Sequence, residues 1–332
     1  MKTYLVTGGC GFIGYNLVRS LRKNMTTDQQ GCIDRIAVVD DLSTGTKSNH
    51  VECVEYMYHS INDCIDDAVE AYHPDTIFHL AAVPRVPYSV EYPYRTFLAN
   101  VVSTVRLLDA VRKFSTKTRV IFSSSSSVYG GADTLPTPEI EPTNPKSPYA
   151  LQKWQSEEWI SMYTSLYNID ACSLRYFNVF GPHSRYGGAY TTVLGAWLYS
   201  IYVDKTAIPY LEGDGLQTRD FCYVDNVVQA NILASQYRGK FKGEAFNIAQ
   251  GNKHSLMDCK ILIEKISGTA LNLVMLPTRI GDVRHTLADI SLAKKILGYN
   301  PSTNFEEQVK YMADWYRTEY AQEFANKVQQ AN

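Results

Sequence analysis

Apolar and polar positions follow two different periodicities along the first half of the chain. Short apolar runs, typical of buried strands, alternate with longer stretches in which apolar residues recur every three or four positions, as on one helix face. Strands and helices that alternate in this way form right-handed crossovers, which predicts a parallel sheet covered by helices on both faces. The expected strands are Tyr4–Thr7, Arg35–Asp40, Glu52–Tyr56, Thr76–Leu80 and Arg119–Ser123, and the expected helices lie near Phe12–Lys23, Ile61–Tyr72 and Tyr94–Phe114.

The pattern changes in the middle of the chain. The segment Gly130–Pro148 holds five prolines and little apolar content, which predicts a long functional loop. A helix is expected to start at Ser147-Pro148, with serine as its cap, and a strand at Ala171–Arg175. From about Phe180 the elements become shorter and less regular.

The length of 332 residues suits one large domain and a smaller one. We expect a doubly wound α/β domain at residues 1–180, with returning segments from about 220–250, and a smaller substrate-binding lobe formed mainly by residues 181–332.

A glycine-rich turn stands where the first expected strand passes into the first helix. Gly8, Gly11 and Gly14 fall in it, and with Gly9 they also spell G-x-G-x-x-G. Glycines allow positive φ and close approach to a pyrophosphate, and the helix N-terminus offers free N–H groups. Asp40 ends the next strand, where an acidic side chain binds the adenosine ribose and disfavours a 2′-phosphate. This combination predicts a Rossmann-type domain that binds NAD rather than NADP; the alternative is a tight turn and a surface aspartate.

Tyr149 and Lys153 lie four residues apart at the start of an expected helix, so both project from one face. Free tyrosine has a pKa of about 10, but a nearby ammonium and a positive nicotinamide ring favour the phenolate. The serines at 123–127 end the preceding strand and would present hydroxyls to the same substrate oxygen. Most tyrosine and lysine pairs at this spacing are incidental contacts on a helix surface. Because this pair follows a predicted NAD-binding half of the chain and a strand-end serine, it predicts a proton-transfer site.

Composition and charge exclude several classes of protein. The net charge of −2 indicates no basic surface, so no nucleic-acid partner is expected. No apolar run approaches the roughly 20 residues of a membrane helix, and the N-terminal segment is too short for a signal peptide. The seven cysteines have no metal-ligand spacing, which predicts free thiols, no metal site and a cytoplasmic location.

With these motifs the chain resembles the extended short-chain dehydrogenase/reductase family, in particular the nucleotide-sugar 4-epimerases. The resemblance runs from Thr3 to about Tyr316, and it implies a tightly bound NAD. The matching segments are Thr7–Gly14, Val38–Gly45, His79–Ala82, Ser123–Gly130, Ser147–Tyr149, Leu174–Gly181 and Gly281–His285. The cofactor-binding residues that it implies are Gly8, Gly11, Phe12, Ile13, Gly14, Asp40, Asp41, Ser43, Ile61, Leu80, Ala81, Ala82, Asn100, Ser123, Tyr149, Lys153 and Tyr176.

The resemblance also implies a reaction at carbon 4 of the sugar. Tyr149 takes the C4 hydroxyl proton and NAD takes the C4 hydride. The transient 4-keto sugar turns over in the site, NADH returns the hydride to its opposite face, and Tyr149 returns the proton. Lys153 holds the nicotinamide ribose, and Ser125 is the family's catalytic hydroxyl. The related 4,6-dehydratases carry an Asp-Glu pair where this chain has serines, which cannot act as that acid and base.

On the substrate side, the resemblance assigns the diphosphate-sugar to Asn178, Arg219 and Arg279 and the uracil to Tyr210 and Leu211. Asp282 would hold the uridine ribose or order Arg219. A surface salt bridge is the alternative for each arginine. The full substrate-binding set is Ser89, Ser125, Ser126, Asn178, Ala189, Val193, Tyr210, Leu211, Arg219, Arg279, Asp282 and Thr286.

Thr286 stands where the family has a residue that walls the pocket beside the C2 substituent. A large tyrosine there restricts entry to non-acetylated sugars, whereas threonine leaves room for an N-acetyl group. The expected substrates are therefore UDP-N-acetylglucosamine and UDP-N-acetylgalactosamine, with UDP-glucose and UDP-galactose in addition. Arg85 departs from the acetyl-sugar enzymes, so a strict UDP-glucose 4-epimerase stays an alternative, as do a 4,6-dehydratase and a non-catalytic NAD-binding regulator.

The same family pairs subunits through two helices. Here these are the helix that contains Tyr149 and the one near Tyr94–Phe114, and both carry apolar side chains. A homodimer is expected.

Overall fold

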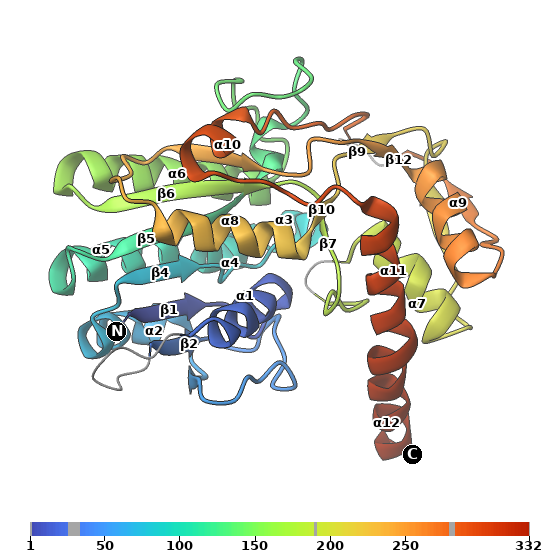
Figure 1. Cartoon of the computed structure of the whole chain (residues 1–332), viewed down its shortest axis with the longest axis horizontal. Helices are drawn as coiled ribbons and strands as arrows, with labels where there is room; N and C mark the ends of the chain where they lie inside the picture. Colours follow the sequence, from blue (N-terminus) through green and yellow to red (C-terminus); the bar gives the residue numbers. More distant parts are fainter. Residues whose placement is uncertain (1, 26–33, 189–190, 279–282, 332) are drawn as a thin grey trace.

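A parallel sheet forms the larger part of the computed structural model, which describes residues 2–25, 34–188, 191–278 and 283–331 (Figure 1). Its seven strands run in the order β11-β6-β5-β4-β1-β2-β3. The chain reverses direction across the sheet between β1 and β4, so the predicted doubly wound Rossmann-type sheet is confirmed. The strands are β1 (Thr3–Thr7), β2 (Arg35–Val39), β3 (Glu55–Met57), β4 (Thr76–His79), β5 (Arg119–Ser125), β6 (Asp170–Tyr176) and β11 (Ala245–Ile248).

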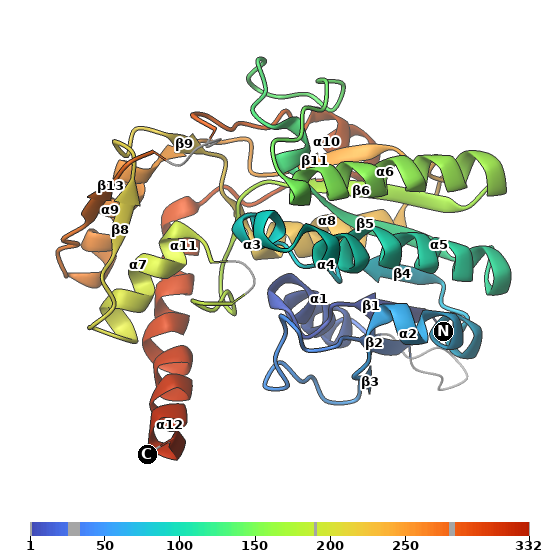
Figure 2. The same ribbon diagram turned by 180° about the vertical axis from the view of Figure 1, so that it is seen from behind.

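Helices cover both faces of the sheet because successive side chains of each buried strand point to opposite sides. In β1, Val6 joins the apolar cluster on one face and Leu5 the cluster on the other. The first face packs against α1 (Phe12–Lys23), α8 (Val224–Gln236) and α10 (Ser291–Leu297). The second packs against α2 (Ile61–Tyr72), α5 (Ser103–Phe114) and α6 (Pro148–Tyr167), which Figure 2 shows from behind.

Two expected elements differ from those observed. The strand expected at Glu52–Tyr56 starts only at Glu55, because Cys53 has φ of 59° and belongs to a turn. The single helix expected near Tyr94–Phe114 is part of a longer series: α3 (Val86–Glu91), α4 (Pro93–Phe97), the π-helical turn η1 (Leu98–Val102) and α5. Tyr92 leaves helical geometry between α3 and α4, where Pro93 supplies no backbone N–H.

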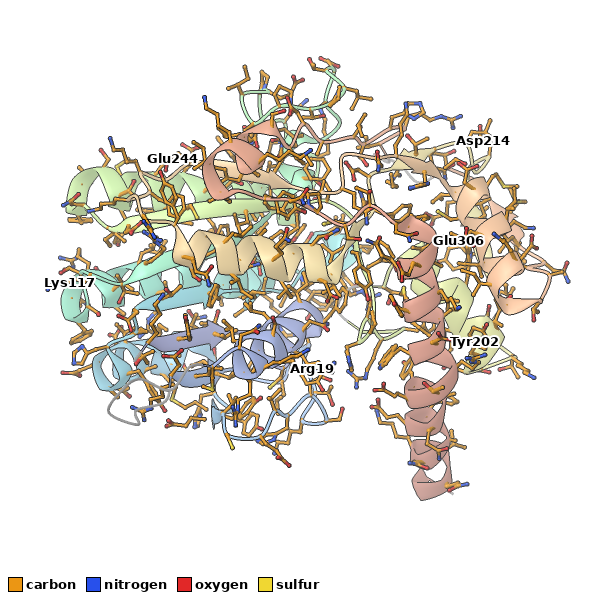
Figure 3. All side chains as sticks on the ribbon, viewed as in Figure 1. Arg19, Lys117, Tyr202, Asp214, Glu244 and Glu306 are labelled. Carbon is orange, nitrogen blue, oxygen red and sulfur yellow. The ribbon has the colours of Figure 1, made fainter. Side chains whose placement is uncertain are left out.

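The smaller lobe lies at one end of the sheet. Figure 3 shows Lys117 at the far end of the sheet, and Tyr202 and Asp214 on the lobe. Among the described residues, no helix has the length and apolar character needed to cross a membrane. The elements of the lobe and its junction are β7 (Val179–Phe180), α7 (Val193–Tyr202), β8 (Tyr210–Glu212), β9 (Thr218–Arg219), β10 (Cys222–Tyr223), β12 (His254–Ser255), α9 (Leu256–Ser267), β13 (Val274–Leu276), α11 (Phe305–Trp315), η3 (Tyr316–Tyr320) and α12 (Ala321–Ala331).

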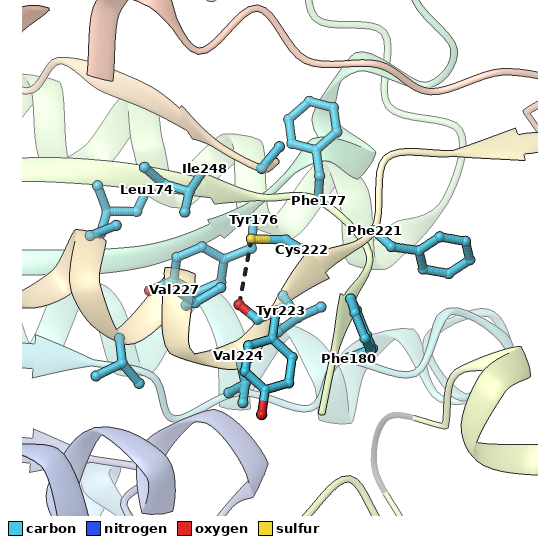
Figure 4. Packing of buried hydrophobic residues seen from close by; sticks show 14 of the residues in the cluster. Leu174, Tyr176, Phe177, Phe180, Phe221, Cys222, Tyr223, Val224, Val227 and Ile248 are labelled. Atoms are coloured by element: carbon cyan, nitrogen blue, oxygen red, sulfur yellow. Dashed lines mark hydrogen bonds between the residues drawn. The ribbon is translucent and has the colours of Figure 1, made fainter. Parts of the chain in front are cut away.

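Aromatic side chains join the lobe to the sheet. Phe180 lies edge-on to Phe221 and Tyr223, with ring centroids 6.0 and 5.5 Å apart, in the cluster shown in Figure 4. These rings belong to the same buried cluster as Leu174 of β6 and Val227 of α8. The junction is therefore part of the main core, and it fixes the lobe above the carboxyl ends of the strands.

Candidate active site

A cavity of about 880 Å³ opens at the carboxyl ends of β1, β2, β4 and β5, between the sheet and the smaller lobe. Ligands of doubly wound sheets bind at this edge, next to the point where the strand order reverses. Most of the residues predicted from the sequence line it: Gly8, Gly11, Phe12, Ile13, Gly14, Asp40, Asp41, Ser43, Ile61, Leu80, Ala81, Ala82, Ser123, Ser125, Ser126, Tyr149, Lys153, Tyr176, Asn178, Arg219 and Thr286.

The glycine turn forms the floor of one end of the cavity. Gly8 has φ of 74°, and a Cβ on Gly14 would lie 2.1 Å from the carbonyl oxygen of Gly8, so a side chain is excluded at both positions. Helix α1 begins directly after Gly11, which makes no side-chain cap hydrogen bond. The first N–H groups of the helix are therefore available to an anion.

Asp40 lies beside this turn at the end of β2. Its Oδ2 accepts a hydrogen bond from the Cys10 N–H at 2.9 Å, and its Oδ1 accepts one from the Leu42 N–H at 2.8 Å. Burial raises the pKa of Asp40, and these two hydrogen bonds oppose the rise. Each carboxylate oxygen keeps a further lone pair for a ribose hydroxyl. The turn, the helix start and Asp40 thus fit the pyrophosphate and adenosine ribose of NAD.

Tyr149, Ser125 and Lys153 meet where β5 ends and α6 begins. Ser147 caps α6, as predicted, by accepting a hydrogen bond from the Ala150 N–H at 3.2 Å. This start places Tyr149 in the first turn, where it lines the same cavity as Ser125. Lys153 Nζ donates to the Ser123 carbonyl at 2.7 Å and lies 6.0 Å from the centre of the Tyr149 ring.

Burial is the largest influence on the pKa values of Tyr149 and Lys153. It raises the pKa of Tyr149 to about 12, and the hydrogen bond with Ser125 opposes the rise. It lowers the pKa of Lys153 to about 7, against the effect of the Glu157 carboxylate. The expectation that a nearby ammonium lowers the tyrosine pKa is therefore not met by the protein's own groups, because Lys153 is buried and turned toward Ser123. When bound, NAD supplies the hydride acceptor and a positive ring that favours the phenolate.

A buried ion pair lies next to Lys153 and the end of β5. Glu157, one helical turn after Lys153, contacts Arg175 of β6 at 2.7 Å, and the two side chains are only 7% and 8% exposed. Ser124 donates to Glu157, and Arg175 donates to the Tyr129 hydroxyl at 2.8 Å. The pair thus connects the end of β5 to α6 and β6. Sequence reasoning missed it, although a glutamate on an inward helix face and an arginine within a strand were available signals.

On the substrate side, Asn178 and Thr286 are held together. Asn178 Nδ2 donates to Thr286 Oγ1 at 3.2 Å and to the Asp220 carbonyl at 3.1 Å, and Thr286 Oγ1 accepts from the Asp220 N–H at 3.1 Å. The buried Asp220 carboxylate accepts three backbone N–H groups at 3.1 Å, from Gln250, Gly251 and Ala288. Burial raises the pKa of Asp220 to about 7. Asp220 therefore fixes the Thr286 segment, a positioning role that sequence reasoning did not find.

Five predicted contacts do not line the cavity. The Ser89 hydroxyl donates to the Val86 carbonyl and accepts from the Tyr149 N–H, so it supports the start of α6 and is not part of the cavity lining. Asn100 likewise bonds the Val83 backbone and Gln152. Leu211 is buried in the core, Tyr210 is exposed on β8 and Val193 begins α7. Ala189, Arg279 and Asp282 lie outside the described residues.

Several lining residues were not predicted. Arg185, Tyr186, Tyr320 and Lys327 close the cavity from the smaller lobe, opposite the loop that follows β2. Arg185 and Tyr186 lie in the loop after β7, and Tyr320 and Lys327 lie on the C-terminal helices, so they meet at the cavity only through the tertiary fold. They are the contribution of tertiary structure to the site.

Comparison with known proteins places the chain in one family. The NAD dependent epimerase/dehydratase family matches residues 4–249. A putative UDP-glucose 4-epimerase of Methanocaldococcus jannaschii is 34% identical, over 94% of this chain and 98% of its own length. The solved UDP-glucose 4-epimerase of Thermotoga maritima with UDP-glucose is 32% identical, with a TM-score of 0.85 over 96% of this chain and 99% of that one.

A second solved structure has a different sugar in its name. The UDP-N-acetylglucosamine 4-epimerase of Methanobrevibacter ruminantium, in complex with UDP-N-acetylmuramic acid, is 31% identical with a TM-score of 0.86, over 96% of this chain and 99% of that one. The resemblance inferred from the motifs is confirmed, as is the NAD cofactor. The chain belongs to the NAD dependent epimerase/dehydratase family.

Proposed function

We propose that the chain is a UDP-sugar 4-epimerase that interconverts UDP-N-acetylglucosamine and UDP-N-acetylgalactosamine, and also UDP-glucose and UDP-galactose. The observation that carries the proposal is the Tyr149–Ser125 pair in an NAD-binding cavity. No acidic pair replaces the serines at 123–127, which disfavours the dehydratase alternative. The relatives described above are named for 4-epimerisation of UDP-sugars, which supports the reaction type.

The chain's own residues perform the proton chemistry. Tyr149, as the phenolate that the positive ring of bound NAD would favour, accepts the proton of the C4 hydroxyl through its phenolic oxygen and later returns it, and Ser125 lines the same cavity, where it would hydrogen-bond the sugar O4. Lys153, whose Nζ donates to the Ser123 carbonyl, would hold the nicotinamide ribose of the cofactor. Arg219 lines the cavity, where a guanidinium suits a diphosphate.

The identity of the sugar depends on the wall of the pocket near Thr286. Thr286 lines the cavity, and its hydroxyl is already used by Asn178 and Asp220, so the side chain is held in one position. Arg85, the departure from acetyl-sugar enzymes, is exposed at the start of α3 and is not part of the cavity lining. It therefore gives no reason against an acetylated substrate.

Substitution of Thr286 tests this wall. We expect Thr286→Tyr to lower kcat/KM for the acetylated pair on the order of a hundredfold while sparing UDP-glucose, because a bulky ring would occupy the space of the acetyl group. Thr286→Ser is the matched control, since it keeps the hydroxyl that Asn178 and Asp220 use. Equal losses on both pairs in Thr286→Tyr would show that another residue sets the size limit.

A coupled assay on the four UDP-sugars, without added NAD, tests the proposed activity. We expect turnover in both directions, with the acetylated pair used at least as well as the other. Accumulation of a 4-keto product would favour a dehydratase, and no turnover of any UDP-hexose would favour the regulator.

A homodimer is proposed for the protein in solution. Exposed apolar side chains cover one face of α6, at Leu151, Trp159, Met162 and Leu166, and α4 adds the exposed Tyr94 nearby. An apolar face of this extent on a soluble protein typically marks an interface.

Charge placed on this face should separate the subunits. We expect the double variant Met162→Glu/Leu166→Glu to elute as a monomer in size-exclusion chromatography with light scattering, because two carboxylates would be buried without partners. Ile261→Glu, on an exposed position of α9, should leave the mass unchanged. A parent protein that is monomeric at micromolar concentration would contradict the dimer.

A further inference from the structure

Arg185 lies at the junction of three segments that are far apart in the sequence. It belongs to the loop after β7, which runs from the sheet into the smaller lobe (Figure 1). Its Nη1 donates to Asn49 Oδ1 at 2.9 Å, and its Nη2 and Nε donate to Glu323 Oε2 at 2.9 and 3.2 Å. Asn49 follows β2, and Glu323 lies on α12. One guanidinium thus joins the NAD-binding domain to the C-terminal helix.

The connection continues to the glycine turn. Asn49 Nδ2 donates to the Cys10 carbonyl at 2.9 Å, and the Thr46 N–H donates to the same oxygen at 3.2 Å. Asn49 is buried, so both ends of its amide are committed, one to Arg185 and one to Cys10. The loop that follows β2 is therefore tied on one side to the turn and on the other to the smaller lobe.

The C-terminal helices hold Arg185 in place. The Tyr316 hydroxyl donates to the Ser184 carbonyl at 2.6 Å, and the Tyr320 hydroxyl donates to the Tyr186 carbonyl at 3.3 Å. The Arg185 and Glu323 side chains are 17% and 23% exposed, so their contact is partly shielded from water. Shielded, charge-assisted hydrogen bonds are stronger than exposed ones.

The position of this connection relative to the cavity indicates its use. Asp41, Ser43 and Asn49 line the cavity at its adenosine end, and Arg185 and Lys327 line the opposite wall. The Arg185 contacts span these two walls. A dinucleotide on the glycine turn would lie behind them, and its release at this end would require the walls to separate.

We propose that the Asn49–Arg185–Glu323 bridge retains NAD by holding the adenosine end of the cavity closed between turnovers. The bridge acts on the cofactor, so the proposal holds whichever UDP-sugar is used. Arg185 is in this sense a positioning residue: it sets the rate of NAD loss and takes no part in proton transfer. The Arg185–Glu323 ion pair is partly exposed, so salt should weaken it. We therefore expect the protein to lose NAD faster at high ionic strength.

The rate of NAD exchange tests the bridge. Holoenzyme is mixed with excess isotopically labelled NAD, and the bound label is measured by mass spectrometry after rapid removal of free cofactor. We expect Arg185→Gln to exchange NAD on the order of tenfold faster than the parent, which corresponds to about 1.4 kcal/mol. Glu323→Ala, which removes the acceptor from a solvent-facing helix, should accelerate exchange in the same direction and serves if Arg185→Gln does not fold.

Lys265→Gln is the matched control, because it breaks an exposed ion pair with Glu306 elsewhere in the same lobe. It should exchange NAD at the parental rate. Parental exchange rates in both Arg185→Gln and Glu323→Ala would overturn the proposal. This holds even if the melting temperatures of the two variants fall, because the ion pair would then stabilise the fold without retaining NAD. Equal acceleration in Lys265→Gln would overturn it too, since general loosening of the lobe would explain the effect.

Discussion

Tyr149→Phe is expected to lower turnover by a factor on the order of a thousand or more, since general acid–base catalysis contributes about 10²–10⁴ and the variant lacks the phenolic oxygen. Tyr149 lines the cavity together with Ser125 at the end of β5, and phenylalanine fills the same space without the ionisable oxygen. The glycine turn and Asp40 are untouched. Bound NAD, measured after acid release, should therefore remain at the parental level, and so should affinity for UDP in calorimetry.

Tyr163→Phe provides the comparison on the same helix, because Tyr163 faces the core far from the cavity. It should retain parental turnover. Substantial activity in Tyr149→Phe would refute the assignment of the proton-transfer group, whereas parallel loss of NAD and UDP binding would point to a structural defect instead.

Arg175→Met is expected to cause a large loss of stability. It would leave the Glu157 carboxylate buried at 7% exposure without its cation, and breaking a buried pair in this way typically costs about 3–5 kcal/mol. The free energy of unfolding can be measured by guanidinium denaturation of the NAD-free protein. The catalytic group should suffer as well, because Glu157 also bonds Ser124 and lies next to Lys153.

Two further variants separate charge from packing. The double variant Arg175→Met/Glu157→Met removes both charges and should recover much of the lost stability. Arg35→Met breaks the exposed pair with Glu55, whose side chains are 45% and 48% exposed, and should cost at most about 1 kcal/mol. A loss in Arg175→Met no larger than that in Arg35→Met would contradict the structural role of the buried pair.

The parts of the fold that were predicted correctly depend on local pattern. Helices α1 and α2 have the bounds expected from apolar periodicity, because each exposes one face and buries the other. The parallel pairing of the strands follows from right-handed crossovers between short buried runs. The break at Tyr92 and the turn at Cys53 were missed, since tertiary packing sets those backbone angles.

The site residues also divide into those that the local sequence predicts and those that depend on tertiary contacts. Gly8, Gly14, Asp40 and Tyr149 stand at strand or helix ends, so their position in the sequence determines their position in the cavity. Contacts such as Arg175 with Glu157 depend on which side chains meet across the fold. Ser89 was expected to bind the sugar, but its hydroxyl is bonded to the backbone of Val86 and Tyr149, a contact that depends on the tertiary fold.

The central claim is that NAD stays bound and that the same hydrogen leaves and returns to carbon 4 of the sugar. The most direct test uses UDP-N-acetylglucosamine, and in parallel UDP-glucose, carrying deuterium at C4, with purified protein and no added NAD. The predicted result is a C4 epimer that retains the deuterium at C4, with no net NADH at 340 nm. Washout of the label into solvent, stoichiometric NADH or an absolute requirement for added NAD would contradict the claim.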